Sequence, residues 1–267
     1  MVDVSEKVVW ITGASSGIGE ALAYALAEKK CRLILSARRE AELNRVKASC
    51  RFPDLVRVLP LDLANQQEVE HAASKAIPLF GHVDVLVNNG GISQRGLVKE
   101  SVSEVYRHLM EVDYFGTIFL TKSLIPHFLE RQQGHFVTVT SITGIASTPY
   151  RSGYAAAKHA LHGFFNALRA ELWKDCKHIK VTLVCPGWTN TNLSLTALTA
   201  DGSAQNKKDE THAKGLPAAR VAAVLVKAIE KQKREVYVGG FKEVAAAYLQ
   251  RYLPGLFARI VRVAKVK

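Results

Sequence analysis

Tyr154 and Lys158 stand four residues apart in a segment, 154–173, that is predicted to be helical. Residues at i and i+4 project from the same face of a helix, so the phenol and the ammonium are expected side by side. A tyrosine ordinarily titrates near pH ~10, and a neighbouring cation favours its phenolate. Such a pair can exchange a proton with a substrate oxygen. A solvated i,i+4 pair on a helix surface is the alternative.

A glycine-rich turn, TGASSGIG from Thr12 to Gly19, joins the first predicted strand to the first predicted helix. Glycines in such a turn allow a positive φ, close approach of the backbone to a pyrophosphate, and tight helix–strand packing. The helix N-terminus adds free N–H groups and partial positive charge. We therefore expect a nucleotide rather than an empty Gly/Ser loop, with contacts from Gly13, Ser15, Ser16, Gly17, Ile18 and Gly19.

The elements that position these groups alternate along the chain. Strands are predicted at 8–11, 32–36, 56–60, 83–87, 136–140, 180–184 and 235–238. Helices are predicted at 18–29, 40–49, 66–80, 104–131, 154–173 and 217–231. This alternation is typical of βαβ units, so we predict one α/β domain, a doubly wound parallel sheet of about seven strands with helices on both faces.

Composition limits the class of protein. With 267 residues, 48% apolar and 22% charged, the chain is typical of one globular domain. No apolar run reaches the ~18 residues of a membrane span, and Glu6 and Lys7 interrupt any secretory leader. The cysteines have no metal-like spacing, so we expect no metal and buried free thiols in a reducing compartment: Cys31, Cys50, Cys176 and Cys185.

The net charge of +12 indicates an anionic partner, whether a nucleotide, a nucleic acid, a phosphate or a membrane surface. No nucleic-acid-binding motif is present, and no dense basic run accompanies stacking aromatic residues. Nucleic acid is therefore the least favoured of these partners.

Further motifs follow the later strands in order. Asp62-Leu63 follows the third strand, Asn88-Asn89-Gly90-Gly91 the fourth, Ser141 ends the fifth, and the segment from Pro186 to Thr191 follows the sixth. Together with TGASSGIG and the Tyr-x-x-x-Lys segment, they make the chain resemble the short-chain dehydrogenase/reductase family over about residues 7–239. Gly90 replaces the family's alanine.

The resemblance implies a Rossmann fold, a nicotinamide cofactor and interconversion of a carbonyl and an alcohol by hydride transfer. It implies that Tyr154 is the general acid in reduction, that Lys158 supports it and holds the nicotinamide ribose, and that Ser141 bonds the substrate oxygen. The further cofactor contacts that it implies are Asp62, Leu63, Asn89, Gly90, Tyr154, Lys158, Pro186, Gly187, Thr189 and Thr191.

Asp113 departs from the family pattern, because a catalytic asparagine is expected there. In the family this residue helps to anchor a water in the proton relay, largely through its backbone carbonyl, so Asp113 can still serve. Its charge would also stabilise Lys158 as the cation. The alternative is a catalytically weak, nucleotide-binding regulatory member of the same fold.

The end of the second strand indicates the cofactor. An NAD-preferring site usually carries a carboxylate there, and this chain has Ala37, Arg38 and Arg39. Arg38 can bond a 2′-phosphate in a bidentate way, with Arg39 behind it. The alternative is that the two arginines are solvated at the start of a helix. Their position at the end of the second strand favours NADP(H) as the cofactor.

We expect residues 1–240 to form an NADP-binding catalytic domain with a substrate lid at about 190–216. Leu193, Leu195 and Leu198 can cover an apolar ligand, whereas residues 207–210 are expected to be solvated and mobile. Ile142, Ile145, Tyr150 and Trp188 can line a pocket, and ordinary core packing is the alternative for each of them. A hydrophobic carbonyl or alcohol is favoured, with its identity and the reaction direction left open.

Residues 241–267 are predicted to be a basic amphipathic extension. After Pro254, apolar residues cluster on one helical face, and Arg259, Arg262 and Lys265 lie on the other. Residues 255–267 therefore contact a membrane surface, the chain's own domain or a partner subunit. The resemblance implies a homodimer or homotetramer packed through helices 104–131 and 154–173. The expected location is cytoplasmic, peripheral at a membrane if that alternative holds.

Overall fold

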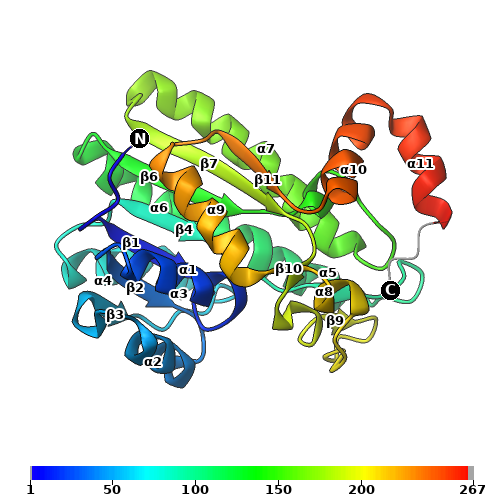
Figure 1. The fold of residues 1–267 in the computed structure, drawn as a ribbon, viewed down its shortest axis with the longest axis horizontal. Helices are drawn as coiled ribbons and strands as arrows, with labels where there is room; N and C mark the ends of the chain where they lie inside the picture. Colours follow the sequence, from blue (N-terminus) through cyan, green and yellow to red (C-terminus); the bar gives the residue numbers. More distant parts are fainter. Residues whose placement is uncertain (1, 264–267) are drawn as a thin grey trace.

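Seven parallel strands form the central sheet of the computed structural model, which describes residues 2–263 (Figure 1). The strands are β1 (Val8–Thr12), β2 (Arg32–Ser36), β3 (Val56–Val58), β4 (Val85–Asn88), β6 (Gly134–Val139), β7 (Ile179–Pro186) and β11 (Glu235–Val238). Their order is β11-β7-β6-β4-β1-β2-β3, so the chain winds outward in both directions from β1. This arrangement confirms the predicted doubly wound Rossmann fold.

Helices cover both faces of the sheet, and two apolar cores fill the spaces between the layers. The first face carries α1 (Gly17–Ala27), α2 (Glu40–Ser49) and α9 (Ala218–Glu230). The second carries α3 (Gln66–Glu70), α4 (Ala72–Ala76), α6 (Gly116–Glu130) and α7 (Ser152–Asp175). In β1, Val9 and Ile11 enter the first core while Val8 and Trp10 enter the second, as the two-residue period of a strand requires.

Two helices predicted as continuous are interrupted. The 66–80 segment is divided at His71 into α3 and α4 and ends in a 3-10 turn, Ile77–Leu79. The 104–131 segment consists of α5 (Ser103–Met110), a π-helical turn at Glu111–Phe115 and α6. A π turn changes which side chains face inward, and such turns are frequent at functional sites.

The segment predicted to be a lid consists of short elements. They are β8 (Thr189–Asn190), the 3-10 turn Asn192–Ser194, β9 (Leu198–Thr199), α8 (Glu210–Ala213) and β10 (Leu216–Pro217). β9 pairs with β5 (Gln94–Arg95), and β10 pairs with β8. These pairings hold the segment against the carboxyl end of the sheet.

Two further helices, α10 (Phe241–Tyr252) and α11 (Pro254–Val263), follow the last strand (Figure 1). The end of the predicted extension, including Lys265, lies outside the described residues. Among residues 2–263, no helix is long and apolar enough to cross a membrane. All four cysteines are buried free thiols, as predicted.

Candidate active site

A cavity of about 970 Å³ opens at the carboxyl ends of β1, β2, β4, β6 and β7. It brings together most of the residues that the sequence motifs singled out. The predicted residues on its wall are Gly13, Ser15, Ser16, Gly17, Ile18, Arg38, Arg39, Asp62, Leu63, Asn89, Gly90, Ser141, Tyr154, Lys158, Pro186, Gly187, Thr189 and Thr191. Two predicted residues lie behind this wall: Gly19 packs against Gly13, and Asp113 forms an ion pair with Lys158.

The glycine turn has the backbone shape that a phosphate-binding loop needs. Gly13 and Gly17 have φ values of +63° and +61°, which side chains other than glycine rarely adopt. A Cβ atom on Gly13 would lie 2.7 Å from the Cα atom of Gly90, and one on Gly19 would collide with the carbonyl oxygen of Gly13. Ser16 begins α1 without a side-chain capping bond, so N–H groups of the first turn are free for an anion.

Thr12 and Asn89 fasten this turn to the end of β4. The Thr12 hydroxyl oxygen accepts hydrogen bonds from the N–H groups of Asn89 and Gly90, both at 3.0 Å. The Asn89 side chain donates to the carbonyl oxygens of Thr12 at 3.0 Å and Gly13 at 3.3 Å. Thr12 was not among the predicted contact residues; it positions the loop.

These residues fit a nicotinamide dinucleotide. The glycine turn and the open start of α1 suit the pyrophosphate, and Asp62 and Leu63 border the cavity beyond β3. Arg38 and Arg39 are exposed and border the same cavity at the end of β2. A 2′-phosphate at that point would meet two guanidinium groups and no carboxylate from residues 36–39.

Tyr154, Lys158 and Ser141 are all at least nine-tenths buried on the other side of the cavity. Tyr154 and Lys158 come from successive turns of α7, and the Lys158 Nζ atom lies 5.6 Å from the centre of the Tyr154 ring. Ser141 follows β6 by two residues and caps a 3-10 turn, Ile142–Gly144, by accepting a hydrogen bond from the Thr143 N–H group at 3.1 Å. Its hydroxyl also donates to the Pro186 carbonyl oxygen at 3.4 Å.

Asp113 lies in the π-helical turn, and its side chain is fully buried. Its Oδ1 atom accepts a hydrogen bond from the Ile92 N–H group at 2.7 Å, and its Oδ2 atom lies 3.4 Å from Lys158 Nζ. Burial would lower the pKa of Lys158, but the negative charges of Asp113 and an ionised Tyr154 outweigh it and raise that pKa. Burial raises the pKa of Asp113, but in its ionised form Asp113 favours the ammonium form of Lys158.

The predicted lid closes the remaining side of the cavity. Leu193, Leu195 and Leu198 line it as expected, and Ile142 and Trp188 face them. Ile145 is absent from the wall and packs behind it, against the apolar cluster that contains Ile142 and Phe257; Tyr150 is also absent from the described wall. The wall also includes residues that sequence reasoning missed: His108, Val112, Arg151, Thr211, His212, Phe257, Ile260 and Val261.

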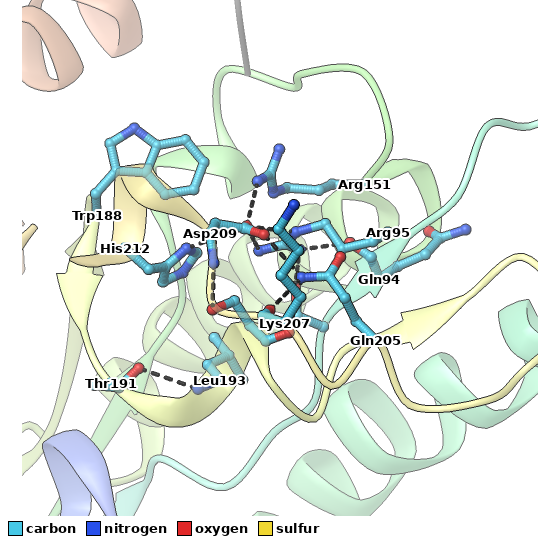
Figure 2. A network of polar contacts seen from close by, with 12 residues as sticks. Gln94, Arg95, Arg151, Trp188, Thr191, Leu193, Gln205, Lys207, Asp209 and His212 are labelled. Carbon is cyan, nitrogen blue, oxygen red and sulfur yellow. Dashed lines mark hydrogen bonds and ion pairs between the residues drawn. The ribbon is translucent and has the colours of Figure 1, made fainter. Parts of the chain in front are cut away.

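A buried ionic cluster holds the segment that is predicted to be a lid, as Figure 2 shows. Asp209 Oδ2 lies 2.6 Å from Arg95 Nη2, 3.2 Å from Arg151 Nη2 and 3.5 Å from His212 Nδ1. Its Oδ1 atom accepts a hydrogen bond from Gln205 at 2.8 Å. The expectation of a solvated segment at 207–210 is therefore wrong for Asp209, because its side chain is 9% exposed and paired with two arginines.

The same cluster reaches the cavity wall. The Arg151 guanidinium lies 4.6 Å from the centre of the Trp188 ring, and the His212 ring meets Trp188 edge-on at 5.0 Å (Figure 2). Burial, aided by the charge of Arg95, lowers the pKa of His212 to about 4. Burial would raise the pKa of Asp209, but hydrogen bonds from Arg95 and Gln205 outweigh it and lower that pKa.

Three side chains outside the cavity, His162, Cys185 and Glu235, have ligand-type atoms within 4.8 Å of one another. These groups already have hydrogen-bond partners. Thr140 Oγ1 lies 3.2 Å from Cys185 Sγ and 3.1 Å from His162 Nε2, and the Tyr237 hydroxyl donates to Glu235 at 2.6 Å. Burial raises the pKa of the Cys185 thiol to about 12, which disfavours a thiolate ligand. We assign no metal to this cluster.

Comparison with known proteins identifies the class. A family model described as short chain dehydrogenase matches residues 7–201, which is more than half of the chain. The protein therefore belongs to the short-chain dehydrogenase/reductase family, and it is an oxidoreductase of that family.

Its relatives cover most of the chain. It is 43% identical over 265 residues to "Dehydrogenase/reductase SDR family member 7B" of Bos taurus, covering 97% of this chain and 81% of that protein. It is 42% identical over 260 residues to "Dehydrogenase/reductase SDR family member 7" of Homo sapiens, covering 94% of this chain and 76% of that protein. A crystal structure of a short chain dehydrogenase/reductase from Burkholderia phymatum in complex with NAD is 25% identical, covers 96% of both chains and has a TM-score of 0.86.

Proposed function

We propose that this protein is an NADP(H)-dependent oxidoreductase that interconverts a carbonyl and an alcohol on a hydrophobic substrate. The observation that carries the proposal is one continuous cavity that joins Arg38 and the glycine turn to Tyr154, Lys158 and Ser141. A bound nicotinamide would supply or accept the hydride at the substrate carbon. The protein's own groups then handle the substrate oxygen.

In the direction of reduction, Tyr154 donates its phenolic proton to the substrate oxygen as the carbon receives the hydride. Ser141 holds that oxygen by a hydrogen bond. The ammonium of Lys158 stabilises the phenolate left on Tyr154, and the ion pair with Asp113 keeps Lys158 charged. In oxidation the same atoms move in reverse: the phenolate takes the hydroxyl proton while the carbon loses a hydride.

The preference for NADP(H) rests on Arg38 and Arg39. Both guanidinium groups border the cavity where β2 ends, which is where a doubly wound fold places the adenosine ribose. Charge-assisted hydrogen bonds to a 2′-phosphate are about twice as strong as neutral ones. The NAD-bound relative shows only that its own chain takes NAD.

The preference for a hydrophobic substrate rests on the cavity wall opposite the glycine turn. Apolar side chains reach it from the loop after β6, from the lid and from α11, and they are Ile142, Leu193, Leu195, Leu198, Phe257, Ile260 and Val261. Such a wall favours an apolar body around one reacting oxygen.

The test is NADPH consumption by the purified full chain against ketones, quinones, steroids and fatty aldehydes. We expect turnover with apolar carbonyls that Tyr154→Phe lowers by about 10²- to 10⁴-fold. Turnover by Tyr154→Phe at close to the wild-type rate would contradict the assigned role. Absence of turnover with every compound, combined with tight NADPH binding, would favour a nucleotide-binding regulator instead.

We also propose that the protein is a cytoplasmic homodimer or homotetramer packed through α5–α6 and α7. The four buried free thiols support a reducing compartment. Light scattering after size-exclusion chromatography measures the mass in solution, and a monomer at micromolar concentration would contradict the assembly.

A further inference from the structure

The last two helices project from one end of the molecule (Figure 1), and α11 divides its apolar side chains between two directions. Phe257 is 8% exposed and packs with Val261 toward the cavity. Leu256, Ile260 and Val263 are 46%, 48% and 83% exposed. Their spacing of four and three residues places them on one outward helical face. The helix therefore docks on its own domain and still presents an apolar face to solvent.

The neighbouring helix α10 also exposes aromatic side chains. Phe241, Tyr248 and Tyr252 are 89%, 50% and 71% exposed, and the two tyrosine rings stack with their centres 6.4 Å apart. Leu253, between the helices, is 56% exposed. Most apolar residues on a soluble surface are scattered singly, whereas a concentration of this kind marks an interaction site. We call these seven residues on α10–α11 the outer face.

The exposed charged side chains of α10 and α11 themselves have one sign. Lys242, Arg251, Arg259 and Arg262 are all exposed. The one acidic residue of the two helices, Glu243, turns inward, where it accepts hydrogen bonds from the N–H groups of Gly240 and Trp188. The partner of this surface must therefore combine apolar material with negative charge.

We propose that the outer face of α10–α11 binds the surface of a bilayer that contains anionic lipid. A bilayer offers acyl chains to Leu256 and Val263, an interface suited to tyrosine rings, and negative headgroups for the arginines. A second copy of this chain is a poorer partner, because a two-fold interface would bring together two copies of a surface whose helices expose only cations.

The docking surface adjoins the cavity. Ile260 is both a member of the outer face and part of the cavity wall, so a bilayer against α11 would lie beside the wall that contacts an apolar ligand. This last step rests on the proposed function, whereas binding to the bilayer does not.

The experiment is vesicle flotation of the full chain. One vesicle contains phosphatidylcholine alone, and the other contains about a third phosphatidylserine. The charge variant is Arg259→Glu/Arg262→Glu, the apolar variant is Leu253→Gln/Leu256→Gln/Val263→Gln, and the control is Lys174→Glu/Lys177→Glu. The control makes the same charge change at two exposed positions, one in the last turn of α7 and one two residues after its end. Melting temperature and NADPH binding confirm that each variant is folded.

We expect the wild type and the control to float with the anionic vesicles and not with the neutral ones. The charge variant should bind the anionic vesicles at least about tenfold more weakly, because it reverses two positive charges near the headgroups. Failure of the wild type to float would overturn the proposal, as would equal binding by the charge variant and the control. If the wild type does not float but forms a dimer that the apolar variant cannot form, the outer face binds a second copy of the chain. Flotation without turnover would leave membrane binding intact and refute only the proposed function.

Discussion

The Nζ atom of Lys158 lies 3.4 Å from Oδ2 of Asp113, and the two side chains are 5% and 0% exposed. The carboxylate comes from a π-helical turn and also accepts a hydrogen bond from the Ile92 N–H group behind the cavity wall. A side-chain amide at this position could accept the same hydrogen bond but could not supply the charge. The aspartate therefore gives this site a buried ion pair in addition to the positioning bond.

Asp113→Asn should move the alkaline limb of the pH–kcat profile to lower pH. The pKa of Lys158 is raised because Asp113 and an ionised Tyr154 outweigh burial, so loss of the Asp113 charge lowers it and the ammonium is lost earlier as pH rises. Asp84→Asn is the matched control, because Asp84 is also buried and ion-paired, to Arg131 at 3.0 Å. It should lower the melting temperature and leave the profile in place. An unshifted profile in Asp113→Asn would show that Asp113 does not set the charge of Lys158.

Tyr154→Phe should lower kcat by about 10²- to 10⁴-fold, the range expected when a positioned acid is removed. NADPH affinity, measured by fluorescence titration, should change little because the glycine turn and Arg38 are untouched. Tyr24→Phe is the control, since its hydroxyl bonds Glu20 at 2.8 Å on α1, and it should keep full activity. A large loss of NADPH affinity in Tyr154→Phe would mean that the main role of the phenol is to bind the cofactor and not to donate a proton.

Arg38→Asp should weaken NADPH binding by about 10- to 100-fold, since hydrogen bonds to a charged group are worth about 1.5–3 kcal/mol. NADH lacks the 2′-phosphate, so its affinity should change much less. Lys47→Asp makes the same charge change on α2, away from the described cavity wall, and should affect both cofactors little. Equal losses for NADPH and NADH in Arg38→Asp would refute the proposed cofactor preference.

The parallel sheet explains how much of the fold and site could be predicted. Fully buried strands such as β1 and β4 are recognisable from continuous apolar runs, and the motifs that follow them must meet at one edge. The π turn around Asp113 could not be predicted, because an α-helix with one inserted residue has nearly the same spacing of apolar residues as an uninterrupted helix. Asp209 stands among charged neighbours, and its partners Arg95 and Arg151 are 114 and 58 positions away. Ion pairs between residues so far apart in the sequence leave no local sequence pattern from which they could be predicted.

Asp209→Asn should loosen the lid without unfolding the domain. The change removes the carboxylate that Arg95 and Arg151 share, and breaking a buried pair can cost about 3–5 kcal/mol. We expect faster hydrogen exchange in residues 190–216 and a higher KM for an apolar substrate. Asp201→Asn is the control, because Asp201 lies in the same segment and is exposed; it should leave both measurements unchanged.

The pH dependence of the lid follows from the same groups. Because the pKa of Asp209 is lowered, its contribution to stability is complete above the unfolded value of about 3.9 and is lost only as pH falls through the lower folded value. His212, with its pKa near 4, stays neutral above pH 5. Exchange in the wild-type lid, corrected for the intrinsic rate, should therefore be constant from about pH 5 to pH 8. A transition near pH 6.5 would mean that a histidine, and not Asp209, controls the lid.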